Sequence, residues 1–234
     1  AGVVDRKAIT AFTLRKLSAL ESDDVDRRLE EVWGRVEEVE GDALDQIAAW
    51  KEVFTPERLG AADLSAGREV FNRTCQRCHS LFGEGFDIGP DITGANRADL
   101  DYLLHNMVAP NAIIPKEYQM TVVLTHDGLL VNGIAVDEND ESLTLRSENE
   151  DIFVEKADIK GRRIDPNSLM PMGQLETLDE AEAVALVAYL QSEAQVPMRL
   201  TESGLDYVFD ESSLYGWHGD EDLWSVQDGA ITGT

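Results

Sequence analysis

Cysteine is scarce in this sequence: the 234 residues contain only two, Cys75 and Cys78, three positions apart. A disulfide between distant parts of the chain is therefore excluded, and so is a zinc site, which needs about four ligands, built on two cysteine pairs. Because both cysteines belong to one motif, their number says nothing more about the redox compartment.

Long apolar runs and basic residues are also missing. No stretch of about 18 apolar residues occurs, so we expect no membrane span. Asp and Glu number 46 against 20 Lys and Arg, a net charge of −26, which argues against a nucleic-acid partner. The acidic surface is typical either of a protein kept hydrated in a salty medium or of one steered towards a basic redox partner. The even spread of charge along the chain favours the first.

The most informative segment present is Cys75-Gln76-Arg77-Cys78-His79. Two cysteines three apart, with a histidine directly after them, form the attachment signature of c-type haem. Each thiol can add to one vinyl group, and the imidazole then lies beneath the iron as an axial ligand. A redox dithiol would need a strand before the first cysteine and a helix beginning at it, which the flanks do not indicate. We therefore predict one covalent haem c, held by Cys75, Cys78 and His79.

A glycine-proline pair follows the motif at a distance that suits a supporting role. The second ring nitrogen of a proximal histidine commonly donates to a backbone carbonyl. Pro90, eleven residues after His79, offers such a carbonyl in the loop Gly89–Gly94. The proline ring stiffens the loop and removes a competing donor. An ordinary turn is the alternative, but its position after the motif favours Pro90 as the partner of His79.

Several side chains could supply the sixth iron ligand. Thioether sulfur suits haem iron, and Met170 precedes Pro171, which favours an extended backbone that can direct a side chain inward. Met170 lies 91 residues after His79, but without the β-rich segment 117–165 the separation is about forty, close to that of small class I cytochromes. We predict Met170. The other candidates, besides an open site, are Met172, Met107, Met120, His105, His126 and His218.

The spacing of apolar residues changes along the chain. It is helical up to about residue 54, then again near 65–75, 99–107 and after Thr177–Glu180, which matches a capping box with Thr177 as the N-cap. From Tyr118 the period becomes two, with a hairpin turn at Asp127-Gly128, so we expect an antiparallel sheet of about four strands. The N-terminal residues resemble no signal peptide, and we expect the chain to be cut from a longer one.

Residues from about 65 to 192 resemble the planctomycete-type cytochrome c domain, a haem-binding module with a β-insertion between its two axial ligands. The matching residues are Gly67, Phe71, Cys75–His79, Phe82-Gly83, Gly89–Asp91, Thr93-Gly94, Asp101–Leu104, Tyr118–Thr121, Ser168–Pro171 and Leu186–Leu190. The resemblance implies electron transfer, with Cys75 and Cys78 as attachment sites, His79 proximal and Met170 distal. Gly67, Phe71 and Tyr189 match the crossing of the first and last helices in cytochromes c, where glycine lets backbones approach and aromatics seal a haem edge.

The resemblance also implies a fold class and a domain organisation. We expect a mainly α chain: a class I cytochrome c-like helical haem domain with an inserted small antiparallel sheet, preceded by helices and followed by a few strands of a truncated β-sandwich. The expected boundaries are 1–60 for the end of a helical-repeat-like region, 61–196 for the haem domain with its insertion at about 117–165, and 197–234 for the tail. The tail resembles the opening strands of the 3-keto-disaccharide hydrolase domain, without its catalytic residues.

The function expected from these residues is periplasmic or other extracytoplasmic electron transfer, because haem c is attached outside the bacterial cytoplasm. The family fuses this domain to dehydrogenases, helical repeats or carbohydrate-active domains, so the expected partner is a redox protein or a fused dehydrogenase domain. The C-terminal strands could also pair between two copies of the chain. By itself the chain is expected to be an electron carrier rather than an enzyme. A haem enzyme or sensor with an open or exchangeable sixth ligand is the alternative, and sugar cleavage would need residues beyond Thr234.

Overall fold

The computed structural model describes residues 11–39, 41–147, 150–198, 212–214 and 223–233. The helices in this part of the chain are α1 Ala11–Ser18, α2 Asp23–Val32, α3 Asp42–Val53, α4 Pro56–Gly60, α5 Leu64–Thr74, α6 Leu100–Val108 and α7 Glu180–Leu190, with 3₁₀ turns η2 Lys116–Tyr118 and η3 Lys156–Asp158. The strands are β1 Gly34–Val36, β2 Ser80–Leu81, β3 Glu84–Gly85, β4 Ile113–Pro115, β5 Met120–Thr125, β6 Leu130–Glu138, β7 Ser142–Arg146, β8 Asp151–Glu155, β9 Ile159–Ile164, β10 Trp224–Gln227 and β11 Ala230–Gly233.

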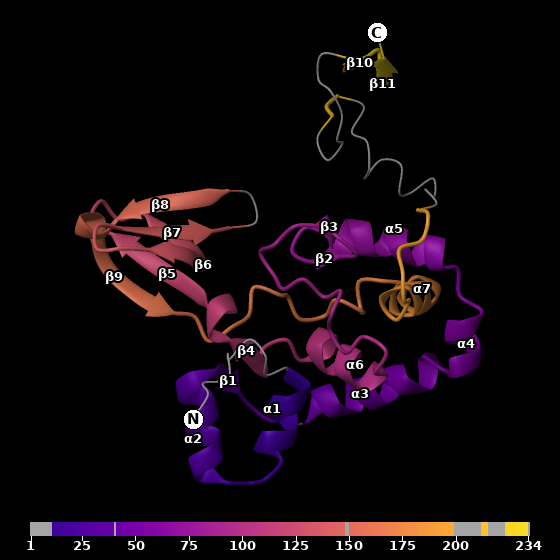
Figure 1. Ribbon diagram of the computed structural model, residues 1–234, viewed down its shortest axis with the longest axis horizontal. Coiled ribbons are helices and arrows are strands. Elements are labelled where there is room, and N and C mark those ends of the chain that lie inside the picture. The colour runs from indigo at the N-terminus through magenta and orange to yellow at the C-terminus, as the bar shows by residue number, and fades with distance from the viewer. Residues whose placement is uncertain (1–10, 40, 148–149, 199–211, 215–222, 234) are drawn as a thin grey trace.

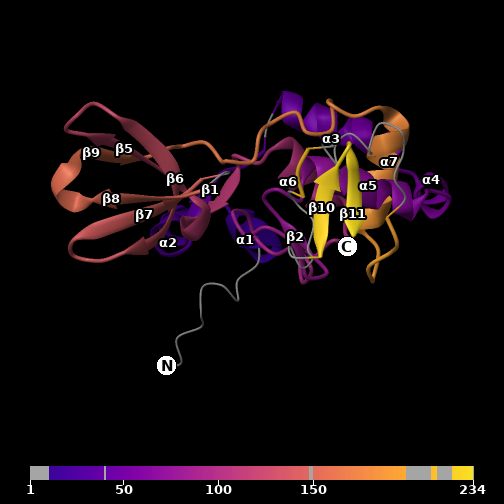
Figure 2. The same ribbon diagram turned by 90° about the horizontal axis from the view of Figure 1, so that it is seen from above.

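The helices and the large sheet lie at opposite ends of the molecule. Figure 1 shows strands β5 to β9 on one side and helices α3 to α7 on the other, and the view from above in Figure 2 agrees. The short pair β1–β4 lies between the two ends, next to α1 and α2. The chain therefore enters and leaves the sheet beside its own N-terminal elements.

The prediction of a mainly α fold is wrong. The structure is 35% helical and 25% strand, with short helices and a five-stranded antiparallel sheet, which makes it a mixed α and β protein. Two misjudged regions account for much of the error. Helical segments alone were expected up to residue 54, but strand β1 lies among them, and the sheet gains a fifth strand that the alternation had not indicated. No helix in the described residues is long and apolar enough to cross a membrane.

Helices α3, α5, α6 and α7 share the largest apolar core. Helix α7 is buried from Ala183 to Leu190 and therefore runs through the middle of this core. Its N-cap is Asp179, whose side chain accepts from the backbone of Glu182 while the Glu182 side chain accepts from the backbone of Asp179. The predicted cap Thr177 instead donates to the carbonyl of Gln174 at 2.8 Å. The capping box is thus two residues later than expected.

The sheet is a meander that folds back on its first strand. Its order is β8-β7-β6-β5-β9, with every neighbouring pair antiparallel. The hairpin predicted at Asp127-Gly128 is confirmed, since β5 pairs with β6 on either side of it. One face buries a second apolar core of its own, which comprises Val123, Val131, Leu143, Leu145 and Val154. The inserted sheet therefore has an apolar core of its own, separate from the core of the helices.

The N-terminal unit, which we define as residues 11–36, has a third core built from Leu14, Leu29 and Trp33. Its last strand, β1, pairs with β4 immediately before the large sheet. Gly34 permits this close approach, because its φ is 144° and an added Cβ would lie 2.3 Å from the carbonyl oxygen of Ile114. A side chain at this position would separate the two strands.

The C-terminal hairpin joins β10 to β11. Asp228 and Gly229 both have positive φ, 51° and 74°, as the two central residues of a type I′ turn require. This hairpin agrees with the few strands expected in the tail 197–234. Most of the remainder of that tail lies outside the described residues.

Candidate functional site

The cysteine motif begins where helix α5 ends. Asp63 caps the start of the helix by accepting from the backbone N–H groups of Ser65 and Ala66. At the other end the chain turns sharply, because the backbone N–H groups of Cys78 and His79 both donate to the carbonyl of Cys75 at 3.0 Å. This turn places the two cysteines and the histidine at the C-terminal end of helix α5, which buries Val70 and Phe71 in the main core.

The two sulfur atoms are thiols rather than a disulfide. Burial raises the pKa of the Cys75 thiol to about 11, although its contact with the Thr74 hydroxyl at 3.2 Å opposes this. Cys75 also packs against the main apolar core. Both sulfur atoms therefore remain available for thioether bonds, and one of them already faces an apolar environment.

His79 makes the contact that the sequence predicted. Its Nδ1 lies 2.9 Å from the carbonyl oxygen of Pro90. A carbonyl only accepts, so Nδ1 carries the proton and Nε2 keeps its lone pair for a metal. Burial lowers the pKa of His79, with the Pro90 contact acting in the opposite direction. The imidazole is thus held neutral in the tautomer that an axial ligand requires.

The backbone around Pro90 leaves no room for a larger residue at position 89. An added Cβ on Gly89 would lie 2.7 Å from Cε1 and 2.9 Å from Nδ1 of His79. The Gly89 N–H also donates to the carbonyl of Cys78 at 2.6 Å. The imidazole therefore lies close against the bare backbone of Gly89.

A set of short-range contacts holds the segment 86–93, which we call the proximal loop. Ile92 N–H donates to the carbonyl of Ser80 at 3.0 Å. The hydroxyl oxygen of Thr93 accepts from Phe82 N–H at 2.8 Å, and the backbone N–H of Thr93 donates to Asp91 at 2.8 Å. The hydrogen bonds that the Asp91 carboxylate accepts from Thr93 hold the pKa of Asp91 below its ordinary value. The partners lie within about a dozen residues of one another.

Arg97 joins the proximal loop to the end of helix α7. Its guanidinium donates to the carbonyls of Thr93, Leu190 and Ser192 and lies 4.9 Å from the centre of the Phe82 ring. This side chain is buried, and burial lowers its pKa. The sequence analysis did not identify Arg97, because nothing in its local spacing distinguishes it from a surface arginine.

Helices α5 and α7 cross in direct backbone contact behind the motif. An added Cβ on Gly67 would lie only 2.0 Å from the carbonyl oxygen of Ala185. The ring of Tyr189 lies 5.8 Å from that of Phe71 and 6.3 Å from that of Phe82. The crossing predicted from Gly67, Phe71 and Tyr189 is therefore present, and it places three aromatic rings beside the cysteine motif.

Met170 lies on the irregular segment 165–176, which we call the distal loop. It is half-buried and packs against the same apolar core as Cys75 and Phe82. Its backbone N–H donates to the Ser168 hydroxyl at 3.1 Å. Ser168 N–H in turn donates to the side-chain oxygen of Asn111 at 2.7 Å. The predicted distal ligand thus shares a core with the motif although 91 residues separate it from His79.

The competing ligands are placed less favourably. Met172 is 64% exposed, Met107 is buried in the core on α6, and Met120 lies on strand β5. His105 has Nδ1 at 2.7 Å from the carbonyl of Asp101 within its own helix, and His126 is exposed. His218 lies outside the described residues. Among the candidates that the structure describes, only Met170 combines contact with the main core and a non-helical backbone.

These residues are chemically suited to a covalent haem. The two thiols, the imidazole beside Gly89, the half-buried thioether and the aromatic crossing are groups of the kind that a haem c would use. Within the described residues, no group of three or more His, Cys, Asp or Glu side chains could hold a metal ion by itself. An iron inside a porphyrin needs only two protein ligands, so the two observations are compatible.

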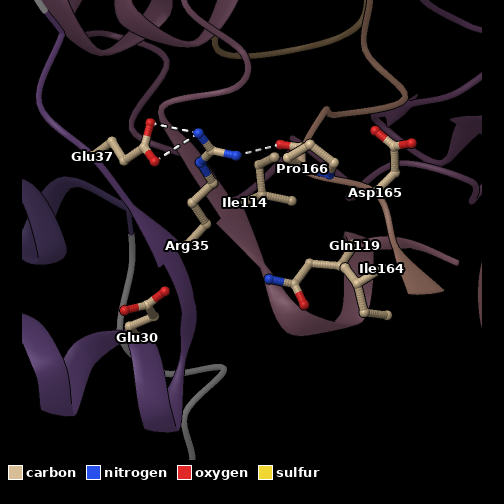
Figure 3. A pocket seen from close by; sticks show the side chains of 8 residues that line it. All are labelled: Glu30, Arg35, Glu37, Ile114, Gln119, Ile164, Asp165 and Pro166. Atoms are coloured by element: carbon tan, nitrogen blue, oxygen red, sulfur yellow. Dashed lines mark hydrogen bonds and ion pairs between the residues drawn. The ribbon is translucent and has the colours of Figure 1, made fainter.

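A separate pocket of about 210 Å³ lies where the N-terminal unit meets the base of the sheet. Figure 3 shows Arg35 between Glu37 and Pro166, with Glu30, Gln119 and Ile164 around the same hollow. A second pocket, of about 490 Å³, lies at the far end of strands β7 and β8. Neither pocket includes a residue of the cysteine motif.

Comparison with known proteins adds no relative. The chain matches no protein-family model, and no curated protein matches it.

Proposed function

We propose that the chain carries one haem c, attached to Cys75 and Cys78, and that it transfers electrons with His79 and Met170 as the axial ligands. The observation that supports this most strongly is the contact of His79 Nδ1 with Pro90, made directly after a Cys-x-x-Cys-His motif. It leaves Nε2 unprotonated and fixes the ring against Gly89. A surface histidine would have no need of such support.

The side chains of the site have distinct tasks in this proposal. A bound haem supplies an iron that cycles between ferric and ferrous states. Pro90 keeps the His79 imidazole in one tautomer, and Met170 offers a soft thioether, which favours a fairly high reduction potential. The packed aromatic rings of Phe71, Phe82 and Tyr189 would exclude water from one side of the haem. A rigid, apolar surrounding limits reorganisation during transfer.

The wider context that we propose follows from the resemblance to the planctomycete-type cytochrome c domain. We propose an extracytoplasmic or periplasmic module of a larger protein that oxidises or cleaves carbohydrates. Its redox partner would be a separate protein or a fused dehydrogenase domain. The C-terminal hairpin would pack against the rest of the chain or pair with a second copy, and the chain alone would carry electrons without catalysing sugar chemistry.

Haem attachment is tested by expression in a host that attaches haem c. The purified chain should gain the mass of one haem, resistant to acid-acetone extraction, and its reduced spectrum should be that of a c-type cytochrome. Cys75→Ser and Cys78→Ser should each leave a single thioether, and the double variant should release its haem on extraction. An unmodified mass with intact thiols would overturn the proposal.

The axial ligands are tested by two matched pairs of variants. His79→Ala should abolish low-spin iron, whereas His105→Ala should not. Met170→Ala should remove the methionine–iron charge-transfer band of the oxidised protein and permit carbon monoxide to bind the reduced protein, whereas Met172→Ala should change neither. Ready carbon monoxide binding by the unaltered protein, with no such band, would instead indicate a haem enzyme or sensor with an open or exchangeable sixth position.

A further inference from the structure

The first half of the distal loop is attached to parts of the chain that lie far away in sequence. Ser168 N–H donates to Asn111 Oδ1 at 2.7 Å, across 57 residues. The carbonyl of Pro166 accepts from Arg35 at 2.6 Å, across 131 residues. Met170 itself depends on the first of these contacts, because its N–H donates to the Ser168 hydroxyl at 3.1 Å.

Asn111 and Arg35 both lie at the β1–β4 strand pair. Asn111 lies in the turn between α6 and β4, where Ala112 N–H donates to the Ala109 carbonyl at 3.1 Å. Strand β4 pairs with β1, and in that register Arg35 is opposite Ile114. Glu37 N–H also donates to the carbonyl of Ala112 at 2.7 Å. The two contacts to the distal loop therefore come from neighbouring points of the β1–β4 pair.

Arg35 is suited to a bridging contact that lysine cannot make. One terminal nitrogen donates to Pro166, and the other pairs with Glu37 at 2.6 Å (Figure 3). Its Nε is buried with no hydrogen-bond partner among the described residues. The planar fork thus spans two acceptors at once, whereas a lysine ammonium on a single stem would have to give up one.

From this arrangement we propose that Asn111 is a positioning residue for Met170, and that the N-terminal unit, through Arg35, determines how firmly Met170 is held towards the iron. The inference rests on the proposed function, because it needs a haem at Cys75 and Cys78. Asn111 fixes the backbone at Ser168, Ser168 fixes the backbone at Met170, and the direction of the thioether follows. Among the described residues, Asn167 of the same loop forms hydrogen bonds only with Asp165, two residues away, and has no such role.

The first test compares Asn111→Ala with Asn167→Ala in the haem-loaded chain. Loss of the Asn111 acceptor should raise the carbon monoxide affinity of the reduced protein about three- to tenfold, the range expected when one hydrogen bond is lost. The methionine–iron band should weaken and the reduction potential should fall. Asn111→Asp keeps the acceptor oxygen and should restore wild-type behaviour, and Asn167→Ala should match the wild type.

The second test does not depend on ligand exchange at the iron. Amide hydrogen exchange at Ser168 and Met170 should become about three- to tenfold faster in Arg35→Lys, again the loss of one hydrogen bond. Arg27→Lys is the control, since Arg27 lies in the same unit but pairs with the exposed side chains of Asp24 and Glu31 rather than with the distal loop. Arg35→Lys also tests the proposal if Asn111→Ala does not fold.

The outcomes separate the inference from the function on which it rests. If Met170→Ala opens the iron to carbon monoxide but Asn111→Ala and Arg35→Lys behave as wild type, electron transfer stands and the positioning role is wrong. If Met170→Ala leaves the spectrum unchanged, Met170 is not the ligand and both the ligation and the positioning role are overturned. Equal effects of Asn111→Asp and Asn111→Ala would also contradict the role, because the acceptor would then not matter.

Discussion

The proximal loop supports one proposed iron ligand, His79, and the distal loop carries the other, Met170, yet the two ligands are held by partners at very different distances along the chain. Pro90 supports His79 from eleven residues away, and Asp91 and Thr93 brace the same turn locally. Met170 depends on Ser168, which depends on Asn111, 57 residues away. The comparison shows that the nearest supports of the proximal ligand are local, although Arg97 also joins its loop to the end of α7, whereas the nearest support of the distal ligand already spans the tertiary structure.

The largest effect should come from removing the core of the N-terminal unit. Trp33 is 6% exposed and packs with Leu14 and Leu29, so Trp33→Ala should cost about 3–5 kcal/mol within that unit. Because only the distal loop is attached to the unit through Arg35, hydrogen exchange should quicken at Met170 and remain unchanged at Gly89 and Ile92. Exchange measured by mass spectrometry on the haem-loaded chain checks this.

The control for that experiment is Trp224→Ala, since Trp224 is exposed in the C-terminal hairpin. It should alter neither loop. If Trp33→Ala loosened the two loops equally, the N-terminal unit would stabilise the whole molecule and the contrast between the loops would be lost.

The next effect compares one glycine from each loop. Gly89→Ala places a Cβ 2.7 Å from the His79 ring and should cost about 2–3 kcal/mol and disturb the low-spin spectrum. Gly173→Ala meets only a flexible Glu176 oxygen at 3.7 Å, so its cost, about 1 kcal/mol, arises from its φ of 77°. Urea unfolding and absorption spectra of both variants are the measurement. Similar spectra for the two would show that the close contact at Gly89 is unimportant.

A smaller effect concerns the unfolding free energy of the protein in acid. The pKa of Asp91 is held below its ordinary value by Thr93 and Ser80, so its contribution is complete above about pH 4 and is lost as pH falls through the lower, folded-state pKa. Because Asp91 is exposed, the contribution should be under about 1 kcal/mol. The unfolding free energy of the wild type should therefore fall more between pH 5 and pH 3 than that of Asp91→Asn.

The distal contact gives the matched comparison for that measurement. Asn111 has no titrating group, so the difference in unfolding free energy between the wild type and Asn111→Ala should be the same at pH 5 and pH 3. A difference that shrinks in acid would mean that a carboxylate also braces the distal loop.

The smallest effect should come from a long-range ion pair of the proximal loop. Asp87 contacts Arg146 of strand β7 at 2.8 Å, but its side chain is 81% exposed. Such pairs contribute about 0.2–1 kcal/mol, so Asp87→Asn, which leaves the pair of Arg146 with Asp151 in place, should change the stability slightly and leave the haem spectrum as it is. A clear spectral change would show that the sheet also orients His79, and the two loops would then be less different than we infer.

Local signals found much of the candidate site. The motif and the Gly-Pro pair were predicted because each is a short-range pattern, whereas the Gly67 crossing was predicted from its match to the first and last helices of cytochromes c. The cap at Thr177 was displaced because two overlapping patterns, Thr177 to Glu180 and Asp179 to Glu182, fit the same stretch. Only the path of the chain into the core decides which of them begins the helix.

Other features had no local signal. Strand β9 was missed because its segment is rich in Lys and Arg and lacks the alternation of a half-buried strand, yet pairing with β5 makes it extended. Strand β1 was assigned to helix because Val32 and Val36 share a helical period, whereas Gly34 and the partner β4 make the segment extended. Both errors contributed to the wrong, mainly α, fold class.

By itself the sequence determined the chemistry on the proximal side: which thiols and which imidazole stand together, and which carbonyl supports the ring. These depend on residues a few positions apart, whose separation the covalent chain limits. The tertiary structure alone decided that Arg35, Asn111 and Met170 belong to one arrangement. Their contacts span tens to more than a hundred residues, and a polar side chain at such a distance is indistinguishable from a solvated one until packing of the three cores brings the segments together.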